Sequence, residues 1–177
     1  MRTNTAVTTV GSDHLLLGPQ TERLPVQGVI WTAGIRCQPP ALTTAAAAPA
    51  SDHRGRLRCS TDLQVAGAED VFAIGDVAWV DDSDGLPLPS NAQVAFQQAE
   101  CLADNLGRAR RGEPLKSFVY KDLGEMMSLG RQNASVTAGG VTLAGRAAFE
   151  LRRLAYLTRL PGRSHQARVA AGWLSDW

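Results

Sequence analysis

The chain has 177 residues, of which 44% are hydrophobic and 20% charged, a composition typical of globular proteins and unlike that of disordered or fibrous ones. Its length leaves room for one domain or two small ones. The formal net charge of +1 argues against a dedicated nucleic-acid-binding protein, which needs a basic surplus for its phosphate contacts, so we expect no nucleic-acid partner.

The cysteines and histidines lack the spacings that disulfide, redox or metal chemistry requires. The three cysteines include no C-x-x-C pair, and the three histidines stand apart from one another. We therefore expect neither a disulfide framework nor a metal site. No apolar run approaches the ~20 residues that span a bilayer, and the first residues lack a signal-peptide pattern, which together indicate a soluble or peripheral protein of a reducing compartment.

The beginning of the chain favours β structure. Strands are predicted over residues 5–10, 14–17 and 26–32, the last ending at Ala33-Gly34, with glycine and proline turns between them. The alanine-rich stretch 41–49 is compatible with either a short helix or a loose loop.

The middle of the chain predicts a buried strand. A polar loop over 51–56 and an extended stretch over 57–65 lead through a turn at 67–70 to the apolar run 71–74, which ends at Gly75-Asp76. A continuous apolar run bounded by turns suits a strand of a parallel sheet that is covered on both faces.

A long amphipathic helix is predicted next. It begins at Ser90 as the N-cap, runs to Arg111 and stops at Gly112. Its packed stripe consists of residues at i+4 spacing, namely Val94, Gln98, Leu102 and Leu106.

The remainder predicts a small antiparallel sheet and a second helix. Glycine turns separate four short strands, over 118–121, 125–129, 135–138 and 141–143. The helix over 146–160 is broken by Pro161-Gly162.

The helix over 146–160 has two apolar faces within a basic tail. Residues 1–145 hold 12 basic and 15 acidic side chains, whereas residues 146–177 hold 6 and 2. One face contains Ala147, Leu151, Leu154 and Leu157; the other contains Phe149, Tyr156 and Leu160, with arginines on both sides. Aromatic residues ringed by arginines suit a membrane interface, so we expect this second ridge to face outward. The alternative is a buried helix with solvated arginines.

The unit Val71–Asp76 carries the clearest chemical signal. Ligands of open α/β sheets bind just beyond the carboxyl ends of the strands. A glycine there lets a ligand approach the backbone closely, and a carboxylate can accept hydrogen bonds from sugar or sugar-alcohol hydroxyls. The alternative interpretation is that Asp76 only caps a loop and binds no ligand.

The start of the long helix adds to this signal. A helix N-terminus offers unpaired N–H groups and a partial positive charge, which can stabilise an anionic ring or a phosphate. Gln93 and Gln97 place two amides on one face of this helix; they either contact a ligand or face solvent.

Four segments in this order resemble the type II NADH:quinone oxidoreductases, flavoproteins of the FAD-dependent pyridine nucleotide-disulfide reductase superfamily. They are VIWTAG (29–34), VFAIGD (71–76), AQVAFQ (92–97) and KDLGEMMSLGR (121–131). The resemblance covers about residues 5–160.

The resemblance implies an α/β fold, with a partial doubly wound FAD/NAD(P)-binding fold followed by a small sheet and an amphipathic helix. Residues 1–50 would end the NAD(P)H-binding domain, 51–112 would be the returning segment of the FAD domain, and 113–177 would form a membrane-associating region. FAD would be the cofactor, NADH or NADPH the co-substrate and a quinone the acceptor. The expected location is the cytoplasmic face of a membrane, and a homodimer is left open.

The resemblance also assigns roles to individual residues. Asp76 would bind the ribityl chain of the flavin, with Gly75 allowing close approach and Gly34 belonging to the strand-end signature that links the two domains. The backbone of Ala92 and Gln93 would face the pyrimidine end of the flavin ring. Gln93 and Gln97 would lie on the quinone side, with Arg152 where family members often carry a lysine.

The chain contains no G-x-G-x-x-G loop, whereas such an enzyme needs one for the FAD pyrophosphate and one for NADH. We therefore expect the C-terminal part of an enzyme whose N-terminal half carries both loops, inactive by itself. The alternatives are a non-catalytic truncated product, a docking module that pairs with a separate N-terminal half, or a peripheral membrane-binding domain without a redox role.

Overall fold

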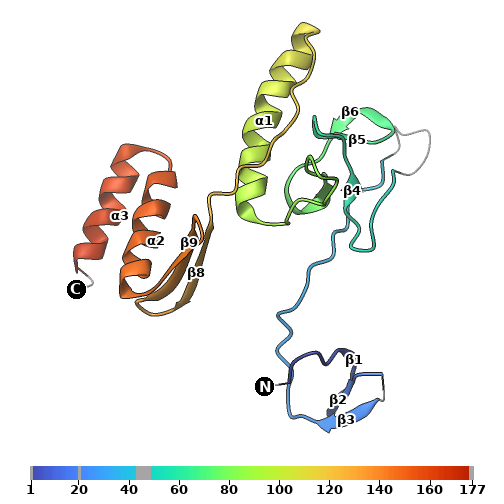
Figure 1. The fold of residues 1–177 in the computed structure, drawn as a ribbon, viewed down its shortest axis with the longest axis vertical. Coiled ribbons are helices and arrows are strands. Elements are labelled where there is room, and N and C mark those ends of the chain that lie inside the picture. The colour runs from blue at the N-terminus through green and yellow to red at the C-terminus, as the bar shows by residue number, and fades with distance from the viewer. Residues whose placement is uncertain (1, 20, 43–48, 176–177) are drawn as a thin grey trace.

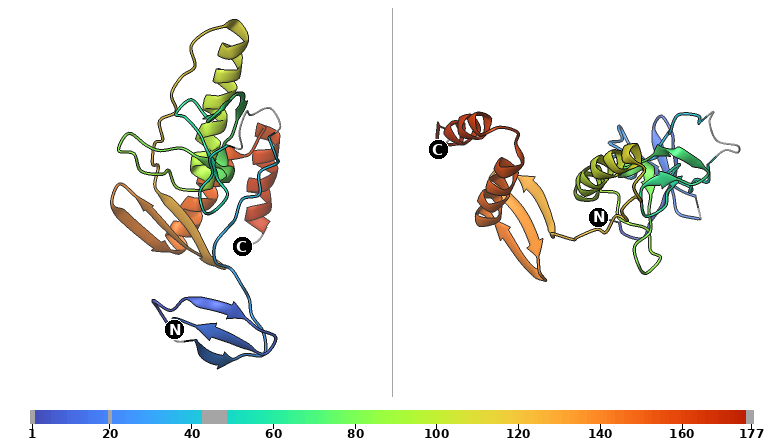
Figure 2. Two further views of the ribbon diagram at one scale, coloured as in Figure 1. Left: turned by 90° about the vertical axis from the view of Figure 1, so that its right-hand side faces the viewer. Right: turned by 90° about the horizontal axis from the view of Figure 1, so that it is seen from above.

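A computed structural model describes residues 2–19, 21–42 and 49–175, which form three units along the chain (Figure 1). An N-terminal sheet, in blue, leads through an extended segment to a central unit around one long helix. A second sheet with two helices, in orange and red, follows and stands beside the central unit on a single connecting stretch of chain (Figure 2, right). The α/β class predicted from the sequence is confirmed.

The N-terminal unit is a three-stranded antiparallel sheet in the order β1-β2-β3. Its strands are β1 (Val7–Val10), β2 (His14–Leu17) and β3 (Glu22–Pro25). The first two were predicted, but the strand predicted over 26–32 is wrong. That segment pairs with no strand in the described part of the chain, and Ile30 is 92% exposed. Because a strand needs a neighbour to satisfy its backbone groups, the β-favouring residues here remain irregular.

The central unit contains two small strand pairs. β4 (Leu57–Arg58) is parallel to β7 (Ala78–Trp79), and β5 (Gln64–Val65) is antiparallel to β6 (Ala68–Phe72). The predicted turn at 67–70 is therefore wrong, because the two residues Ala66-Gly67 already close a tight hairpin, in which Gly67 has φ +81°. β6 pairs antiparallel, so a buried parallel strand over 71–74 is also wrong, and the described residues do not confirm a doubly wound sheet.

Apolar side chains from these strands and from the following helix form one core. Its buried members are Leu57, Cys59, Leu63, Val65, Ala68, Ala73, Ala78, Val80, Val94 and Phe118. The predicted extended stretch over 57–65 thus supplies much of the core, although only its two ends pair as strands.

The long helix α1 (Ala92–Arg111) confirms the prediction closely. Its N-cap is Asn91, one residue after the expected Ser90, and Asn91 Oδ1 accepts the Val94 N–H at 2.9 Å. Gly112 ends the helix in the left-handed conformation.

The packed stripe of α1 is confirmed at three of its four predicted positions. Val94 and Gln98 are buried and Leu102 packs against the core, as predicted. Leu106, in contrast, is 52% exposed, and its neighbour Asn105 is completely buried. At its last predicted position the helix therefore packs through the polar side chain of Asn105 and not through Leu106.

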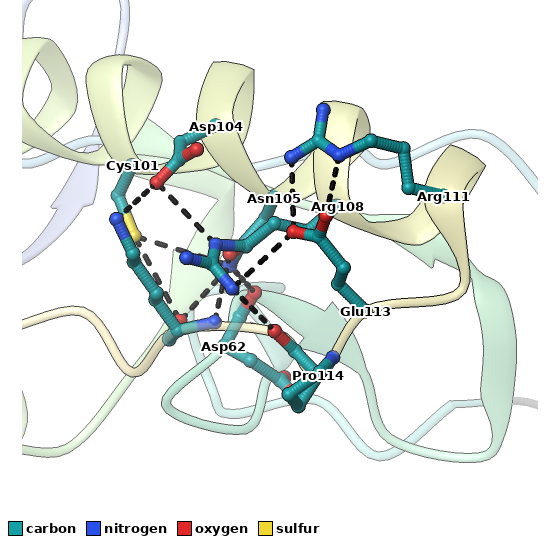
Figure 3. A network of polar contacts seen from close by, with 9 residues as sticks. Asp62, Cys101, Asp104, Asn105, Arg108, Arg111, Glu113 and Pro114 are labelled. Carbon is teal, nitrogen blue, oxygen red and sulfur yellow. Dashed lines mark hydrogen bonds and ion pairs between the residues drawn. The ribbon is translucent and has the colours of Figure 1, made fainter.

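Residues 113–124 run back along α1 toward its start. They form no strand, so the strand predicted over 118–121 is wrong. Side chains of α1 bind their backbone instead. Asn105 accepts the Lys116 N–H at 2.8 Å and donates to the carbonyls of Lys116 at 2.9 Å and Asp62 at 3.2 Å, and Arg108 donates to the Pro114 carbonyl at 3.2 Å (Figure 3).

The C-terminal unit is an antiparallel sheet in the order β10-β9-β8, with two helices after it. Its elements are β8 (Glu125–Gly130), β9 (Asn133–Ala138), β10 (Val141–Gly145), α2 (Arg146–Arg159) and α3 (Arg163–Ser175). α2 was predicted within one residue; α3 was not predicted. No helix in the described ranges combines the length and hydropathy needed to cross a membrane.

The outward ridge predicted for α2 is confirmed at Tyr156, which is 44% exposed, but not at Phe149. Ala148 is fully buried, and Phe149 packs against the same small core of Ala134 and Val136. Leu151 and Leu154 are 45% and 57% exposed. The expectation that Phe149 faces outward is therefore wrong, because the sheet packs against the face of α2 that carries both Ala148 and Phe149.

Candidate functional site

The turn at Gly75-Asp76, which opens the short 3-10 helix η1 (Gly75–Val77), lies directly against the first turns of α1. Gly75 has φ +69°, and a Cβ atom there would lie 3.3 Å from the Cβ of Ala95. The Gly75 N–H donates to Gln98 Oε1 at 2.7 Å, and Gln98 is only 2% exposed. A buried side chain of α1 thus fixes the turn whose position the sequence predicted.

Asp76 presents its carboxylate to solvent at this turn. Among the residues that the structure describes, none donates to or pairs with that carboxylate, whereas the Asp76 carbonyl accepts the Cys37 thiol at 3.0 Å. The Cys37 N–H in turn donates to the Arg54 carbonyl at 2.7 Å. The carboxylate is therefore available to a ligand, while the backbone beside it is held by the extended N-terminal segment.

Gly34 lies in that extended segment, with φ +77°. A Cβ atom at Gly34 would meet nothing within 4 Å. Its left-handed conformation favours glycine, but nothing in the described chain approaches it closely.

Ala92 and Gln93 occupy the first two positions of α1, just after its cap. Ala92 is exposed, and Gln93 is half-buried. The N–H groups of a first helical turn have no partner within the helix, so the start of α1 has donors to offer beside the Gly75-Asp76 turn.

The side chains of Gln93 and Gln97 both bind the segment that returns along α1. Gln93 accepts the Leu123 N–H at 2.6 Å and donates to the Gly124 carbonyl at 2.9 Å. Gln97 accepts the Lys121 N–H at 3.0 Å and donates to the Lys121 carbonyl at 2.9 Å. The sequence predicted that the two amides share a face, but not that this face holds the backbone of 121–124.

Arg152 lies on α2, in a different unit from the two glutamines. Its guanidinium stacks on the Tyr156 ring at 4.6 Å, and its Nε atom is buried without a hydrogen-bond partner among the described residues. The structure therefore does not bring Arg152 together with Gln93 and Gln97.

A buried ion pair lies beside the start of α1, in residues 51–56, for which the sequence predicted only a polar loop. Arg56 Nε donates to Asp52 Oδ2 at 2.8 Å, and both side chains are at most 10% exposed. The guanidinium of Arg56 also reaches Ser90 Oγ at 3.5 Å. The i, i+4 spacing of an acid and a base was the signal that could have revealed it.

The pKa of Asp52 is lowered from its usual 3.8 to about 2. Burial alone would raise it, but hydrogen bonds from the backbone and side chain of Arg56 and from the Arg54 N–H outweigh that effect. The carboxylate of Asp52 is therefore more stable in the folded chain than in the unfolded one.

Because the pKa of Asp52 is depressed by folding, its contribution to stability is complete above about pH 4 and is lost as the pH falls toward about 2. We predict that Asp52→Asn lowers the unfolding free energy at pH 7 and that this deficit shrinks between pH 4 and pH 2. Urea denaturation at several pH values measures this, with the exposed Asp84→Asn as the control. If Asp52→Asn lowered the unfolding free energy equally at pH 7 and at pH 2, the carboxylate of Asp52 would not be the source of the stabilisation.

Comparisons with known proteins place the chain in a family. Residues 1–99 match the model of the pyridine nucleotide-disulphide oxidoreductases, and the chain belongs to this family, as the sequence motifs indicated. It is 39% identical over 181 residues to demethylphylloquinone reductase NdbB of Synechocystis sp., covering 99% of the chain and 44% of that protein. It is 35% identical over 165 residues to alternative NAD(P)H-ubiquinone oxidoreductase C1 of Arabidopsis thaliana, covering 89% of the chain and 31% of that protein.

The fold is also similar to a solved structure, that of NDH2 from Plasmodium falciparum in complex with NADH. The TM-score is 0.67 at 12% identity, with 90% of this chain and 48% of that chain covered. The chain thus spans less than half the length of the relatives it matches.

Proposed function

We propose that the chain supplies the flavin-facing and quinone-facing part of an NAD(P)H:quinone oxidoreductase. The observation that carries this proposal is the Gly75-Asp76 turn, held by Gln98 at the start of α1 with the Asp76 carboxylate left for a ligand. The names of the two relatives, both reductases of quinones, support the substrate class.

The residues around this turn fit a flavin. Gly75 has no side chain to block the approach, and a carboxylate at Asp76 can accept hydrogen bonds from ribityl hydroxyls. The backbone of Ala92 and Gln93, at the positive end of α1, would stabilise negative charge on the ring. A bound FAD would supply the hydride- and electron-transfer chemistry, while this chain binds and orients it.

On the quinone side we propose Gln93, Gln97 and Arg152. Each glutamine amide carries a second N–H, for which the described residues show no partner, and the neighbouring Phe96 is 58% exposed. These donors and this apolar ring would receive a quinone carbonyl and its ring. Arg152 would contribute charge only if the C-terminal unit approaches the start of α1.

We further propose that the chain requires a segment carrying the two dinucleotide-binding loops and is inactive without it. In this arrangement residues 1–50, with Gly34, end the NAD(P)H-binding domain, 51–112 form the FAD-facing segment and 113–177 form the C-terminal region. The second candidate function is that of a docking module, which the exposed Ile30, Trp31 and Ile35 favour, since exposed apolar patches mark binding surfaces.

Flavin retention tests the proposal. The chain would be purified alone and with the part of the Synechocystis relative that lies outside the matched region, each with added FAD. The chain alone should emerge from gel filtration without flavin, and the pair should retain it. In the pair, Asp76→Ala should weaken FAD binding roughly tenfold or more, because it removes charge-assisted hydrogen bonds. Asp84→Ala, in an exposed loop, should leave FAD binding unchanged. If both variants retained FAD equally well, Asp76 would be a structural residue and not a flavin ligand.

We also propose that residues 146–175 contact a membrane surface, which would make the protein peripheral on the cytoplasmic face. Leu151 and Leu154 are exposed on α2, and arginines flank them along the same helix. Exposed apolar groups beside basic ones bind anionic lipid surfaces through two additive effects.

Vesicle co-sedimentation checks the membrane proposal. Binding to anionic vesicles should exceed binding to neutral ones and should weaken with salt without vanishing, because only the charge attraction is screened. Leu151→Ala with Leu154→Ala should remove the salt-resistant part, while Arg159→Gln should reduce the salt-sensitive part. Equal, negligible pelleting with both kinds of vesicle at low salt would refute membrane contact.

A further inference from the structure

One face of α1 carries polar side chains at i+4 spacing that all touch the returning segment. They are Gln93, Gln97, Cys101 and Asn105, next to the buried Val94 and Gln98. Gln93 and Gln97 bind residues 121–124, and Asn105 binds Lys116 on both its N–H and its carbonyl. Cys101 Sγ lies 3.9 Å from the Lys116 carbonyl. We call Gln93, Gln97 and Asn105 the amide stripe.

The first two members of the amide stripe act as rungs of a ladder. Residues four apart on a helix are about 6 Å apart along its axis, and residues two apart on an extended chain are about 6.6 Å apart. Gln97 and Gln93 therefore match Lys121 and Leu123 in register. Each amide donates once and accepts once: Gln97 bonds both backbone groups of Lys121, and Gln93 bonds the Leu123 N–H and the Gly124 carbonyl. The helix thus satisfies backbone groups that an extended segment would otherwise pair with a neighbouring strand.

The ladder ends where the C-terminal sheet begins. Gly124, whose carbonyl accepts from Gln93, directly precedes β8. Its backbone lies so close to β9 that a Cβ atom would meet the Thr137 carbonyl. On the neighbouring face, Gln98 holds Gly75. The first two turns of α1 are thus in contact with both the Gly75-Asp76 turn and the chain that enters the C-terminal sheet.

We propose that Gln93 and Gln97 are positioning residues. Their amides fix residues 121–124 in register on α1 and so orient the C-terminal unit, residues 125–175, relative to the Gly75-Asp76 turn. The importance of this orientation for electron transfer rests on the proposed function. The hydrogen bonds of Gln93 and Gln97 to residues 121–124 are observed whether or not that function is correct.

Amide hydrogen exchange on the full chain tests the ladder without any cofactor. Gln97→Leu should speed exchange of the Lys121 amide roughly 2- to 10-fold, the equivalent of one lost hydrogen bond, and Gln93→Leu should do the same for the Leu123 amide. Glu100→Leu, on the exposed side of α1, is the control and should change neither. Unchanged exchange in both glutamine variants would overturn the proposal.

A conservative variant separates hydrogen bonding from space filling. In Gln97→Glu the carboxylate can still accept the Lys121 N–H but cannot donate to the Lys121 carbonyl until it is protonated. After correction for the intrinsic rate, protection of the Lys121 amide should therefore rise as the pH is lowered in Gln97→Glu and stay flat in Gln97→Leu. Identical behaviour of the two variants would show that Gln97 only fills space.

Residual dipolar couplings test the orientation. In the wild-type chain the couplings of α1 and α2 should fit one alignment, and in the double variant Gln93→Leu, Gln97→Leu those of α2 should shrink relative to those of α1. Couplings that fit one alignment equally well in both proteins would overturn the positioning role. Either result leaves the flavin test above unaffected, so the two proposals can fail independently.

Discussion

Replacing Gly124 by alanine is expected to lower the unfolding free energy of the chain by roughly 2–5 kcal/mol, from left-handed strain and overpacking together. Gly124 has φ +90°, and an added Cβ would lie 2.1 Å from the Thr137 carbonyl oxygen and 2.9 Å from the Ala138 Cα. Both neighbours are in the same sheet, so relieving the clash requires β9 to move away from the segment that holds Gly124.

Gly139→Ala is the matched control for Gly124→Ala. Gly139 also has a positive φ, +56°, in the same unit, but a Cβ there would meet nothing within 4 Å. Gly139→Ala should therefore lower the unfolding free energy by only about 1–2 kcal/mol, the cost of a non-glycine residue in the left-handed conformation. Urea denaturation with amide exchange of β8 and β9 measures both. Equal losses in the two variants would mean that the close approach at Gly124 is unimportant.

Replacing Asn105 by leucine should destabilise the chain by about 3 kcal/mol or more, although the two side chains are similar in size. Asn105 is completely buried, and its loss leaves the Lys116 N–H and the carbonyls of Lys116 and Asp62 without their partner. A buried polar group left unpaired costs about 1–3 kcal/mol.

Glu100→Leu serves as the control for Asn105→Leu, since it makes the same kind of change on the exposed side of the same helix. Denaturant titration should show a large shift for Asn105→Leu and a shift within about 0.5 kcal/mol for the surface change. A small effect at Asn105 would indicate that water or a rearranged segment replaces its three hydrogen bonds to backbone groups.

The local features of the fold could be predicted from the sequence. The helix α1 was predicted within a residue because its cap, its apolar spacing and its terminal Gly112 are all encoded within the segment itself. The Gly75-Asp76 turn was found for the same reason. The β9–β10 hairpin follows from its short Gly139-Gly140 turn, which fixes the register locally. The β8–β9 hairpin instead turns at Arg131-Gln132, where Gln132 has φ +56°.

Features that depend on distant partners could not be predicted. A strand over 26–32 was expected from composition, but a strand also needs a neighbour, and the described chain provides none. Whether Phe149 or Leu151 faces the sheet depends on which face of α2 the sheet covers, and the spacing of apolar residues does not decide between two apolar faces.

The amide stripe could not be predicted from the sequence for a related reason. The i+4 spacing of Gln93 and Gln97 is evident in the sequence, but their partners lie 24 to 31 residues further along the chain. The partners are backbone groups, which every residue carries, so no residue type marks them in the sequence. For the same reason the sequence does not predict the buried position of Asn105, and its apolar spacing predicts Leu106 on the packed face instead.

The most direct measurement of the proposed function is NADH-dependent quinone reduction by the reconstituted pair. The chain would be combined with FAD and with the part of the Synechocystis relative that lies outside the matched region, and NADH oxidation would be followed with and without a soluble quinone. We predict quinone-dependent oxidation by the pair, none by the chain alone, and a strong loss in Asp76→Ala but not in Asp84→Ala. A pair that assembles and retains flavin yet reduces no quinone, or one whose activity is indifferent to Asp76→Ala, would contradict the proposal.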